Sequence, residues 1–139
     1  MKFILMDYVQ AEGWNKLANA EKQQWLGAYI AYVEAMKKSG VLSASNGLQP
    51  SATAATVRVA NGKTQVLDGP YADTKEQLGG FHIIDVADLD AALSWAARSP
   101  TALHGVVEVR PINEMSLEEL LRSLAGDGPE KTLASLKRP

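Results

Sequence analysis

The sequence contains no cysteine and only two histidines, His82 and His104. The lack of cysteine excludes disulfide bonds, thiolate zinc sites and cysteine nucleophiles together. Two imidazoles are too few for a metal site built from several histidines of one chain. The chain also lacks a phosphate-binding loop, a dinucleotide-binding fingerprint and the motif around a nucleophilic serine. We therefore expect neither a metal ion nor a cofactor.

An excess of positive charge is missing as well. Fourteen Lys and Arg residues oppose sixteen Asp and Glu residues, which gives a formal net charge of -2. Nucleic-acid binding needs a basic face that displaces counterions, so this balance argues against nucleic acid as a partner. The apolar run at residues 3–6 is too short to cross a bilayer or to form the core of a signal peptide. We expect no membrane partner and a cytoplasmic location.

The sequence does have enough apolar residues, 46%, for one domain with a buried core. Alternation with a period of two predicts strands, and apolar residues at helical spacing predict helices. The predicted strands cover residues 2–9, 56–59, 63–67, 81–86 and 106–110. The predicted helices cover residues 19–39, the stretch from the cap Asp88 to Pro100, and residues 116–125. Residues 1–126 form the predicted domain, and residues 127–139 form a loose or partner-clasping tail.

Local signals support these boundaries. Asn19 is a suitable N-cap for the first helix, and Ser116 with Glu119 forms a capping box for the last one. Asn61-Gly62 is a strong hairpin signal because both residues tolerate positive φ. The remaining stretches, which we interpret as connections or turns, are residues 10–18, 43–55 and 68–80.

Apolar side chains also form stripes along two of the predicted helices. On the first helix the stripe consists of Leu26, Tyr29, Ile30, Val33 and Met36. On the last helix it consists of Leu117, Leu120, Leu121 and Leu124. We expect both stripes to be buried. A second stripe on the first helix contains three aromatic residues and one methionine, Trp25, Tyr29, Tyr32 and Met36, and is interpreted as core or interface.

The predicted order of elements is β-α-β-β-β-α-β-α. Without one hairpin strand and the last helix it becomes β-α-β-β-α-β, the ferredoxin-like α+β arrangement. Two helices can cover only one face of such a sheet. The predicted strands are too apolar for the other face to be exposed to solvent. Their apolar residues include Phe3, Leu5, Val57, Val59, Ile84 and Val107. We therefore expect a second sheet to cover it, most simply in a homodimer.

The segment Asp68-Gly69-Pro70-Tyr71, continued to Phe81, resembles the hallmark of the YCII-related family and its DGPF subgroup, which usually has Phe where Tyr71 stands. The resemblance covers roughly residues 2–112. Its further matching stretches are residues 47–50, 56–59, 88–93, 95–98 and 107–111. The resemblance implies a dimeric α+β barrel, in which two ferredoxin-like protomers pack sheet to sheet and pockets lie between sheet and loops.

Better-studied relatives in this family are suspected enzymes with a His–Asp pair. Their His lies on the first helix and their Asp just before a Pro that follows the second helix. This sequence departs at both places, because residues 19–39 contain no His and Ser99 precedes Pro100. The relatives' chemistry therefore cannot be transferred to this chain. Some genes of the subgroup lie beside those of extracytoplasmic-function sigma factors.

The turn around Asp68 has two interpretations. Asp, Gly and Pro can simply reverse the chain, and Asp73 with Glu76 has the capping-box spacing of one helical turn. In the functional interpretation, a ligand binds at the end of a strand, where it contacts the side chains of Asp68, Tyr71, Lys75 and Glu76. Gly79-Gly80 would then allow close backbone approach.

Two further positions are candidates for chemistry. Glu108 and Arg110 point the same way along a strand; they form either an ion pair or an anchor for a carboxylate or phosphate. His82 is either an interior histidine or the best available general base, because an imidazole changes its charge near neutral pH. As a base it needs Asp7, Asp68 or Glu108 to orient it. His104, in the loop before the last predicted strand, is expected to be solvent-exposed and receives no role.

Two functions stay open at this point. The first is a homodimeric small-molecule-binding or interaction module, linked to sigma-factor or stress signalling, whose ligand is small and polar or anionic. The second is a cofactor-independent enzyme that acts on a small polar or aromatic metabolite. It would use His82 with a carboxylate and Arg110.

Overall fold

The computed structural model describes residues 1–126. Its helices are α1 (Asn19–Lys38), α2 (Leu89–Ala97), α3 (Thr101–His104) and α4 (Leu117–Leu124). Its strands are β1 (Lys2–Gln10), β2 (Leu42–Gly47), β3 (Ala55–Ala60), β4 (Lys63–Asp68), β5 (Glu76–Asp85) and β6 (Val106–Pro111). The predicted tail at residues 127–139 lies outside the described residues.

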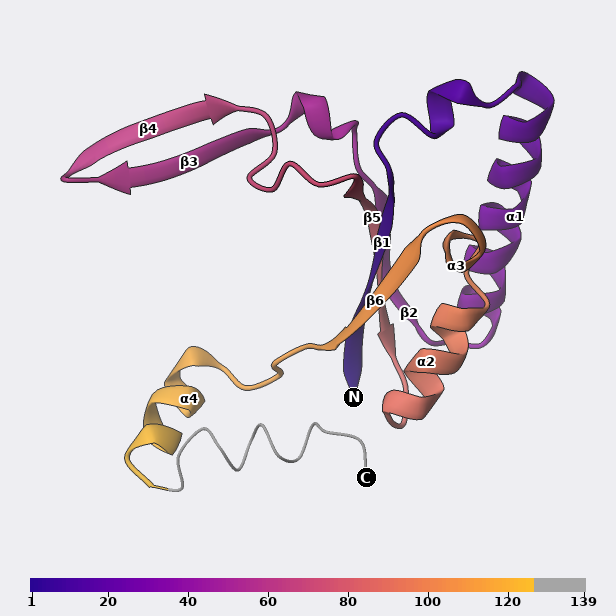
Figure 1. The fold of residues 1–139 in the computed structure, drawn as a ribbon. Coiled ribbons are helices and arrows are strands. Elements are labelled where there is room, and N and C mark those ends of the chain that lie inside the picture. The colour runs from indigo at the N-terminus through magenta and orange to yellow at the C-terminus, as the bar shows by residue number, and fades with distance from the viewer. Residues whose placement is uncertain (127–139) are drawn as a thin grey trace.

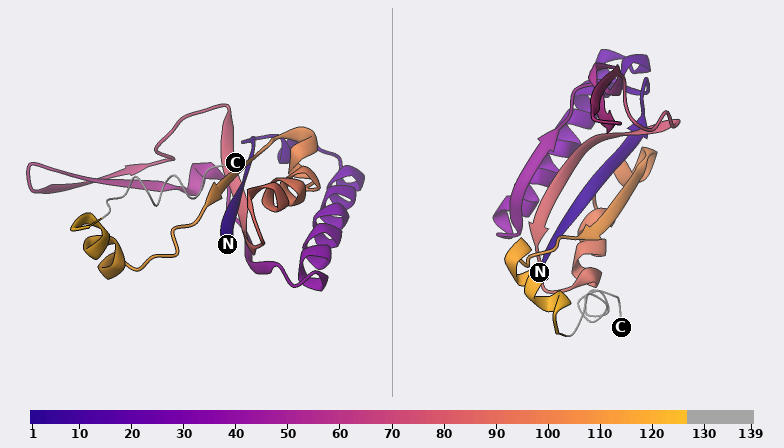
Figure 2. Two further views of the ribbon diagram at one scale, coloured as in Figure 1. Left: turned by 90° about the horizontal axis from the view of Figure 1, so that it is seen from below. Right: turned by 90° about the vertical axis from the view of Figure 1, so that its left-hand side faces the viewer.

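Four of the strands form an antiparallel sheet in the order β2-β5-β1-β6. Together with α1 and α2, this order gives the ferredoxin-like arrangement, so the predicted α+β class is confirmed. Figures 1 and 2 show α1 and α2 on one side of the sheet, while the β3–β4 hairpin and α4 extend from the other side.

Two details of the predicted topology are wrong. The second strand of the ferredoxin-like unit is β2, which lies largely in the stretch interpreted as a connection. Strands β3 and β4 pair only with each other in a separate two-stranded sheet. The whole hairpin is therefore an insertion between β2 and β5, and it does not lend one strand to the main sheet.

The core lies between the sheet and the two long helices. Alternate residues of each strand face the helices, and the fully buried side chains there include Phe3, Leu5 and Ile84. Tyr32 and Met36 of α1 pack against them. Leu26 and Ile30, predicted as part of the buried stripe, are exposed because the buried face of α1 is rotated toward Tyr32. Val57 and Val59 are also exposed, at 63% and 65%, because they lie on the projecting hairpin.

The helix ends confirm most of the predicted caps. Asp88 Oδ1 accepts the backbone N–H of Ala91 at 2.8 Å, and Ser116 with Glu119 forms the predicted capping box. At α1 the prediction is wrong by one residue, because the N-cap is Ala18 and Asn19 is already helical. The short helix α3 occupies a stretch that was interpreted as a loop.

A β-bulge interrupts the pairing of β1 with β5. Asp7 is paired with Gly80, but the next residue, Tyr8, is paired with Leu78, so Gly79 is the extra residue. A Cβ atom added to Gly80 would lie 3.0 Å from the carbonyl oxygen of Asn46, so glycine permits the close approach of β2. Bulges bend a strand and redirect its side chains, and this one lies beside Asp7.

Tyr32 connects the two long helices and gives a testable pH dependence. Its hydroxyl donates to the carbonyl oxygen of Trp95 at 2.7 Å. Burial, and then the negative charge of Asp7, hold the pKa of Tyr32 well above its usual value of 10.0. The folded state therefore favours the neutral phenol, and this stabilising contribution is present below pH 10.0 and lost as the pH rises through the higher pKa of the folded state.

We expect Tyr32→Phe to lower the free energy of unfolding by about 1 kcal/mol at neutral pH, because a buried hydrogen bond is lost. Above about pH 10, where tyrosine ordinarily ionises, the loss of stability with rising pH should be shallower than in the wild type. Urea unfolding at several pH values measures both effects. Tyr71→Phe, at a side chain that is 79% exposed, is the control. Identical pH profiles for Tyr32→Phe and the wild type would exclude this role.

Candidate active site

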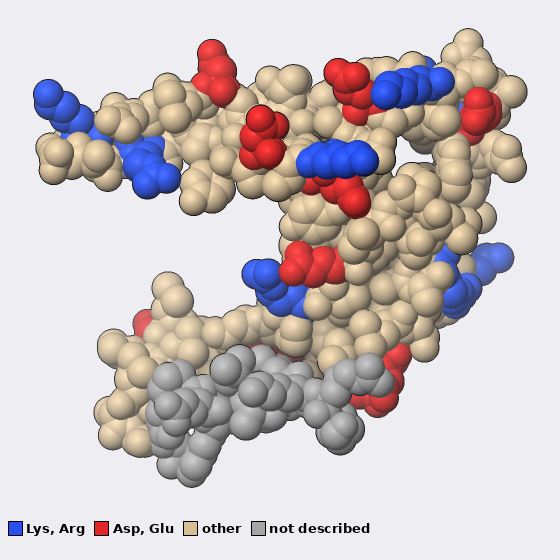
Figure 3. All heavy atoms as spheres, viewed as in Figure 1, with Lys and Arg blue, Asp and Glu red and all other residues tan. Residues whose placement is uncertain are grey.

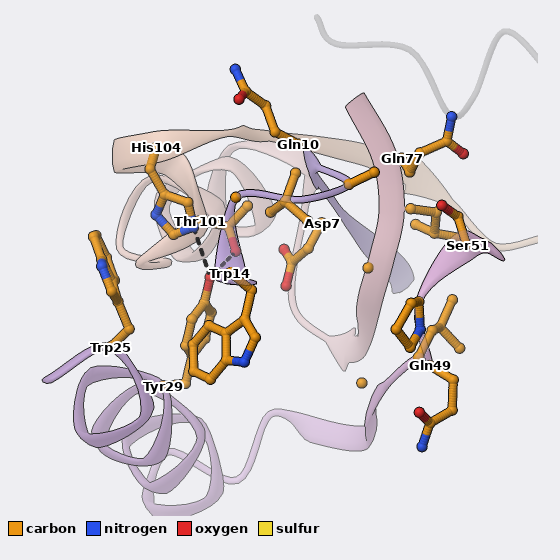
Figure 4. Close-up of a pocket in the computed structure, with 18 of the residues that line it drawn as sticks. Asp7, Gln10, Trp14, Trp25, Tyr29, Gln49, Ser51, Gln77, Thr101 and His104 are labelled. Carbon is orange, nitrogen blue, oxygen red and sulfur yellow. Dashed lines mark hydrogen bonds between the residues drawn. The ribbon is translucent and has the colours of Figure 1, made fainter. Parts of the chain in front are cut away.

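A pocket of about 1070 Å³ lies between the sheet, helix α1 and helix α3. Its wall includes Asp7 from β1, Ser45 from β2 and His82 from β5. These three strands are neighbours in the sheet. Figure 4 shows the Asp7 carboxylate directed toward the side that carries Trp14 and Tyr29, with Trp25 beyond Tyr29.

Asp7, His82 and Ser45 form a connected set of polar side chains. His82 Nδ1 lies 2.8 Å from Ser45 Oγ, and His82 Nε2 lies 3.5 Å from Asp7 Oδ2. Ser45 and His82 are direct partners across β2 and β5, which fixes their separation. Asp7 and His82 are only 7% and 6% exposed, and the Tyr32 ring lies edge-on to the imidazole at 5.5 Å between centroids.

The proton positions in this set follow from the acceptor-only chemistry of an ionised carboxylate. The tautomer that suits this neighbour carries its proton on His82 Nε2, beside Asp7. In the neutral imidazole, Nδ1 is then the acceptor, and the Ser45 hydroxyl donates to it. This is the arrangement in which a histidine can take a proton from a hydroxyl while a carboxylate stabilises the resulting imidazolium.

The set is not fully hydrogen-bonded. Asp7 Oδ1 is buried and has no hydrogen-bond partner in the structure, and the 3.5 Å contact between Asp7 and His82 is too long to count as one. A buried carboxylate without partners is destabilising. Its presence on the wall of a pocket is therefore better explained by a role toward a bound molecule than by a role in folding.

A second cluster lies on the α1–α3 side of the pocket. The Tyr29 hydroxyl is 2.5 Å from Thr101 Oγ1 and 3.5 Å from His104 Nε2. The Trp25 and His104 rings meet at 4.2 Å between centroids. Burial raises the pKa of Tyr29; the Thr101 hydrogen bond opposes the shift and the Asp7 charge adds to it. Tyr29 therefore stays a neutral phenol at physiological pH.

The structure brings together only some of the residues singled out in the sequence. His82 meets Asp7, one of three carboxylates considered for it. Asp68, Tyr71 and Lys75 are exposed in and around the turn that follows β4, outside this pocket. Glu76 is half-buried at the start of β5, so the predicted helical turn ending there does not form.

That turn is folded by its own hydrogen bonds. The Gln77 side-chain amide donates to the carbonyl oxygens of Ala72 and Thr74, at 3.0 and 2.7 Å. The Thr74 hydroxyl donates to the carbonyl oxygen of Glu76. These contacts agree with the interpretation of the segment as a chain reversal.

Glu108 and Arg110 form an ion pair at 3.2 Å. Their partners in β1 are Met6 and Ile4, which alternate with the buried Leu5. Both side chains therefore lie on the sheet face turned away from the helices, opposite to His82. Arg110 is not part of the pocket wall, so it cannot hold a ligand beside His82 in this arrangement.

The pocket also contains residues that were not identified from the sequence as site residues. Ser45 gave no signal because it lies in the strand that was missed. Thr101 and His104 lie on α3, which was interpreted as a loop, although His104 is exposed as expected. Trp25 and Tyr29 belong to the second stripe predicted on the first helix. They line the pocket, and only the other two members of that stripe, Tyr32 and Met36, belong to the core.

The positions of the relatives' His–Asp pair have other roles in this chain. Ser99, which precedes Pro100, is buried, and its hydroxyl accepts the backbone N–H of Thr101 at 3.2 Å. Among residues 1–126, no three His, Asp or Glu side chains converge as a metal site would require. No helix in this part of the chain has the length and apolarity needed to cross a membrane.

Comparison with known proteins agrees with the resemblance seen in the sequence. A family model for the YCII-related domain matches residues 1–116. An uncharacterized protein of Rhizobium meliloti (strain 1021) is 48% identical over 83 residues, which cover 58% of this chain and 64% of that protein.

Among solved structures, 5-chloro-2-hydroxyhydroquinone dehydrochlorinase from Burkholderia phenoliruptrix AC1100, in complex with 2,5-dihydroxybenzoquinone, is 16% identical with a TM-score of 0.48. That alignment covers 83% of this chain and 96% of the dehydrochlorinase. The match of the family model over residues 1–116 assigns the chain: it belongs to the YCII-related domain family.

Proposed function

We propose that this protein is a cofactor-independent acid–base enzyme that binds a small metabolite in the pocket beside His82. The observation that carries the proposal is the buried set of Asp7, His82 and Ser45 on the pocket wall. A histidine placed between a carboxylate and a hydroxyl on a pocket wall has the surroundings of a general base.

Ser45 is the member of this set that hands protons to and from the ligand. A ligand proton moves to Ser45 Oγ while the hydroxyl proton of Ser45 moves to His82 Nδ1, 2.8 Å away. Asp7 then faces the Nε2–H of an imidazolium and stabilises its charge. No proton is lost in this step, and its reverse returns the proton to the product.

The rest of the pocket supplies binding and orientation. Apolar and aromatic side chains form much of its wall, as is usual for small-molecule sites. The neutral Tyr29 hydroxyl, held by Thr101, offers a hydrogen bond at a fixed position. The ligand is accordingly a compact molecule with an apolar or aromatic body and a few polar groups.

A screen followed by an exchange assay tests the proposal. Metabolites that raise the melting temperature of the wild type are incubated with the protein in D₂O, and NMR detects deuterium entering the ligand. We expect His82→Gln and Ser45→Ala to slow this exchange by about 10²- to 10⁴-fold, the usual contribution of a general base. Arg110→Gln, on the opposite face, should behave as the wild type. Binding without exchange in the wild type would instead favour the non-catalytic binding module.

We also propose that the protein works as a homodimer. The sheet face without helices carries the half-buried apolar side chains Ile4, Met6, Phe81 and Ile83. Figure 3 shows this region as a hollow between the projecting hairpin and α4. A two-stranded hairpin is at best marginally stable by itself. The β3–β4 hairpin has an apolar surface that a second copy can cover, formed by the exposed side chains of Val57, Val59, Val66 and Leu67.

Helix α4 supports the same proposal. Its leucines were predicted to be buried, but Leu117, Leu121 and Leu124 are 84%, 70% and 62% exposed, because the helix projects away from the sheet. An amphipathic helix with an uncovered apolar stripe is typical of an interface element. The suggested link to sigma-factor or stress signalling stays a prediction from the family resemblance.

A further inference from the structure

The pocket wall is electrostatically one-sided. Among the described residues that line it, the acidic side chains are those of Asp7 and Glu21, and no Lys or Arg contributes to it. A carboxylate or phosphate ligand would therefore meet acidic side chains without a Lys or Arg in the wall to offset them. Anion sites in proteins normally place an Arg, a Lys or free backbone N–H groups at the ligand.

The N-terminus of α1, beside the pocket, already carries an acidic side chain. Glu21 lies in the first turn of α1, and its Oε1 atom accepts the backbone N–H of Ala18 at 3.3 Å. A carboxylate in this position occupies the positive end of the helix dipole. It leaves less attraction for a second anion at the pocket.

Asp7 provides an acceptor that matches a cation. Its Oδ1 atom is buried and unpartnered, while Oδ2 faces His82. Since an ionised carboxylate only accepts hydrogen bonds, any group that satisfies Oδ1 has to be a donor. A protonated amine brings both the donor and the opposite charge, and such charge-assisted hydrogen bonds are about twice as strong as neutral ones.

Aromatic rings complete the surroundings of a cation. The Asp7 carboxylate points toward the side of the pocket that carries Trp14 and Tyr29, and Trp25 lines the pocket beyond Tyr29, next to His104 (Figure 4). The faces of such rings attract ammonium groups when these are removed from water. The Lys22 ammonium group already lies 5.7 Å from the centroid of the Trp14 ring. It is not itself a lining residue of the pocket.

We infer that the molecule bound beside His82 is a small organic cation, a protonated amine attached to an aromatic or apolar body. This inference rests on the proposed function and names its substrate class. The sequence analysis considered an anionic ligand with Arg110 as its anchor. A cation takes the place of that ligand here, because Arg110 lies on the other face of the sheet. The amine donates to Asp7 Oδ1, and the apolar body packs among the aromatic side chains.

Three probes of similar size and different charge test the inference: phenethylamine, phenethyl alcohol and phenylacetate. Dissociation constants are measured for the full chain by ligand-observed NMR. In the wild type we expect the amine to bind at least ~10-fold more tightly than the alcohol or the anion. In Asp7→Asn, which keeps the size of the side chain, the amine should lose this preference. Trp14→Leu should weaken the amine more than the alcohol.

Two results would overturn the inference: phenylacetate binding at least as tightly as the amine, or an unchanged amine preference in a folded Asp7→Asn protein. If Asp7→Asn does not fold, the ranking of the three probes on the wild type decides alone. The proposed function fails by a different result, the absence of His82-dependent proton exchange. A neutral or anionic ligand that exchanges a proton through His82 would overturn the ligand class and leave the enzyme proposal in place.

Discussion

A Leu117→Glu/Leu121→Glu variant is expected to be monomeric at concentrations where the wild type is a dimer. Both leucines lie on the exposed apolar stripe of α4. Covering a leucine side chain contributes about 1.5–3 kcal/mol, and a two-fold interface uses each residue twice. Losing these contributions and burying carboxylates instead should weaken the dimer by more than about 1000-fold. Light scattering coupled to size-exclusion chromatography measures the mass directly.

The control for this experiment uses the polar face of the same helix. Glu118→Gln/Arg122→Gln changes two side chains of α4 outside the leucine stripe and should remain dimeric. Neither variant alters the capping box of Ser116 and Glu119, so the helix itself should persist in both. A wild type that is monomeric at micromolar concentration would contradict the dimer, as would a leucine variant with unchanged mass.

Gly105→Ala is expected to be strongly destabilising. A Cβ atom at this position would lie 2.3 Å from the backbone oxygen of Tyr8 and 3.3 Å from Thr101 Cγ2. Because the first of these atoms belongs to the backbone of the central strand β1, it cannot move aside without shifting the sheet. Overpacking of this kind costs about 1–3 kcal/mol. Chemical denaturation of the purified variant measures the loss.

Gly27→Ala is the matched control. Gly27 lies in the middle of α1, and nothing lies within 4 Å of the Cβ atom that would be added. Alanine is a better helix former than glycine by about 0.5–1 kcal/mol, so this variant should be at least as stable as the wild type. Equal losses of stability in the two variants would show that the tight contact of Gly105 with Tyr8 is unimportant.

The fold was predictable from the sequence where local signals were strong. The caps at Asp88 and Ser116 and the Asn61-Gly62 turn lie where they were expected. Strand β2 was missed because Ser43, Ala44, Ser45 and Asn46 have low β-propensity. The strand forms because β5 offers it a partner, with glycine at Gly80 allowing close approach. Pairing with a distant strand is information that a local pattern does not contain.

The candidate site was only partly predictable for a related reason. His82 could be identified as a base from its residue type, and Asp7 as one of its three candidate partners. Which partner is correct depends on strand register, which places Asp7 on the helix-covered face and Arg110 on the other face. Ser45 joins the site from a third strand, so its role depends on the same long-range pairing.

Imidazole NMR of the ligand-bound protein tests the role of His82 most directly. The chain has two histidines, so a His104→Gln variant assigns both ring signals. Titration with a molecule that raises the melting temperature should shift the His82 ring signals in step with binding, and Asp7→Asn should reduce that shift. Saturation of the protein with no change at His82 would contradict a catalytic pocket built on this histidine.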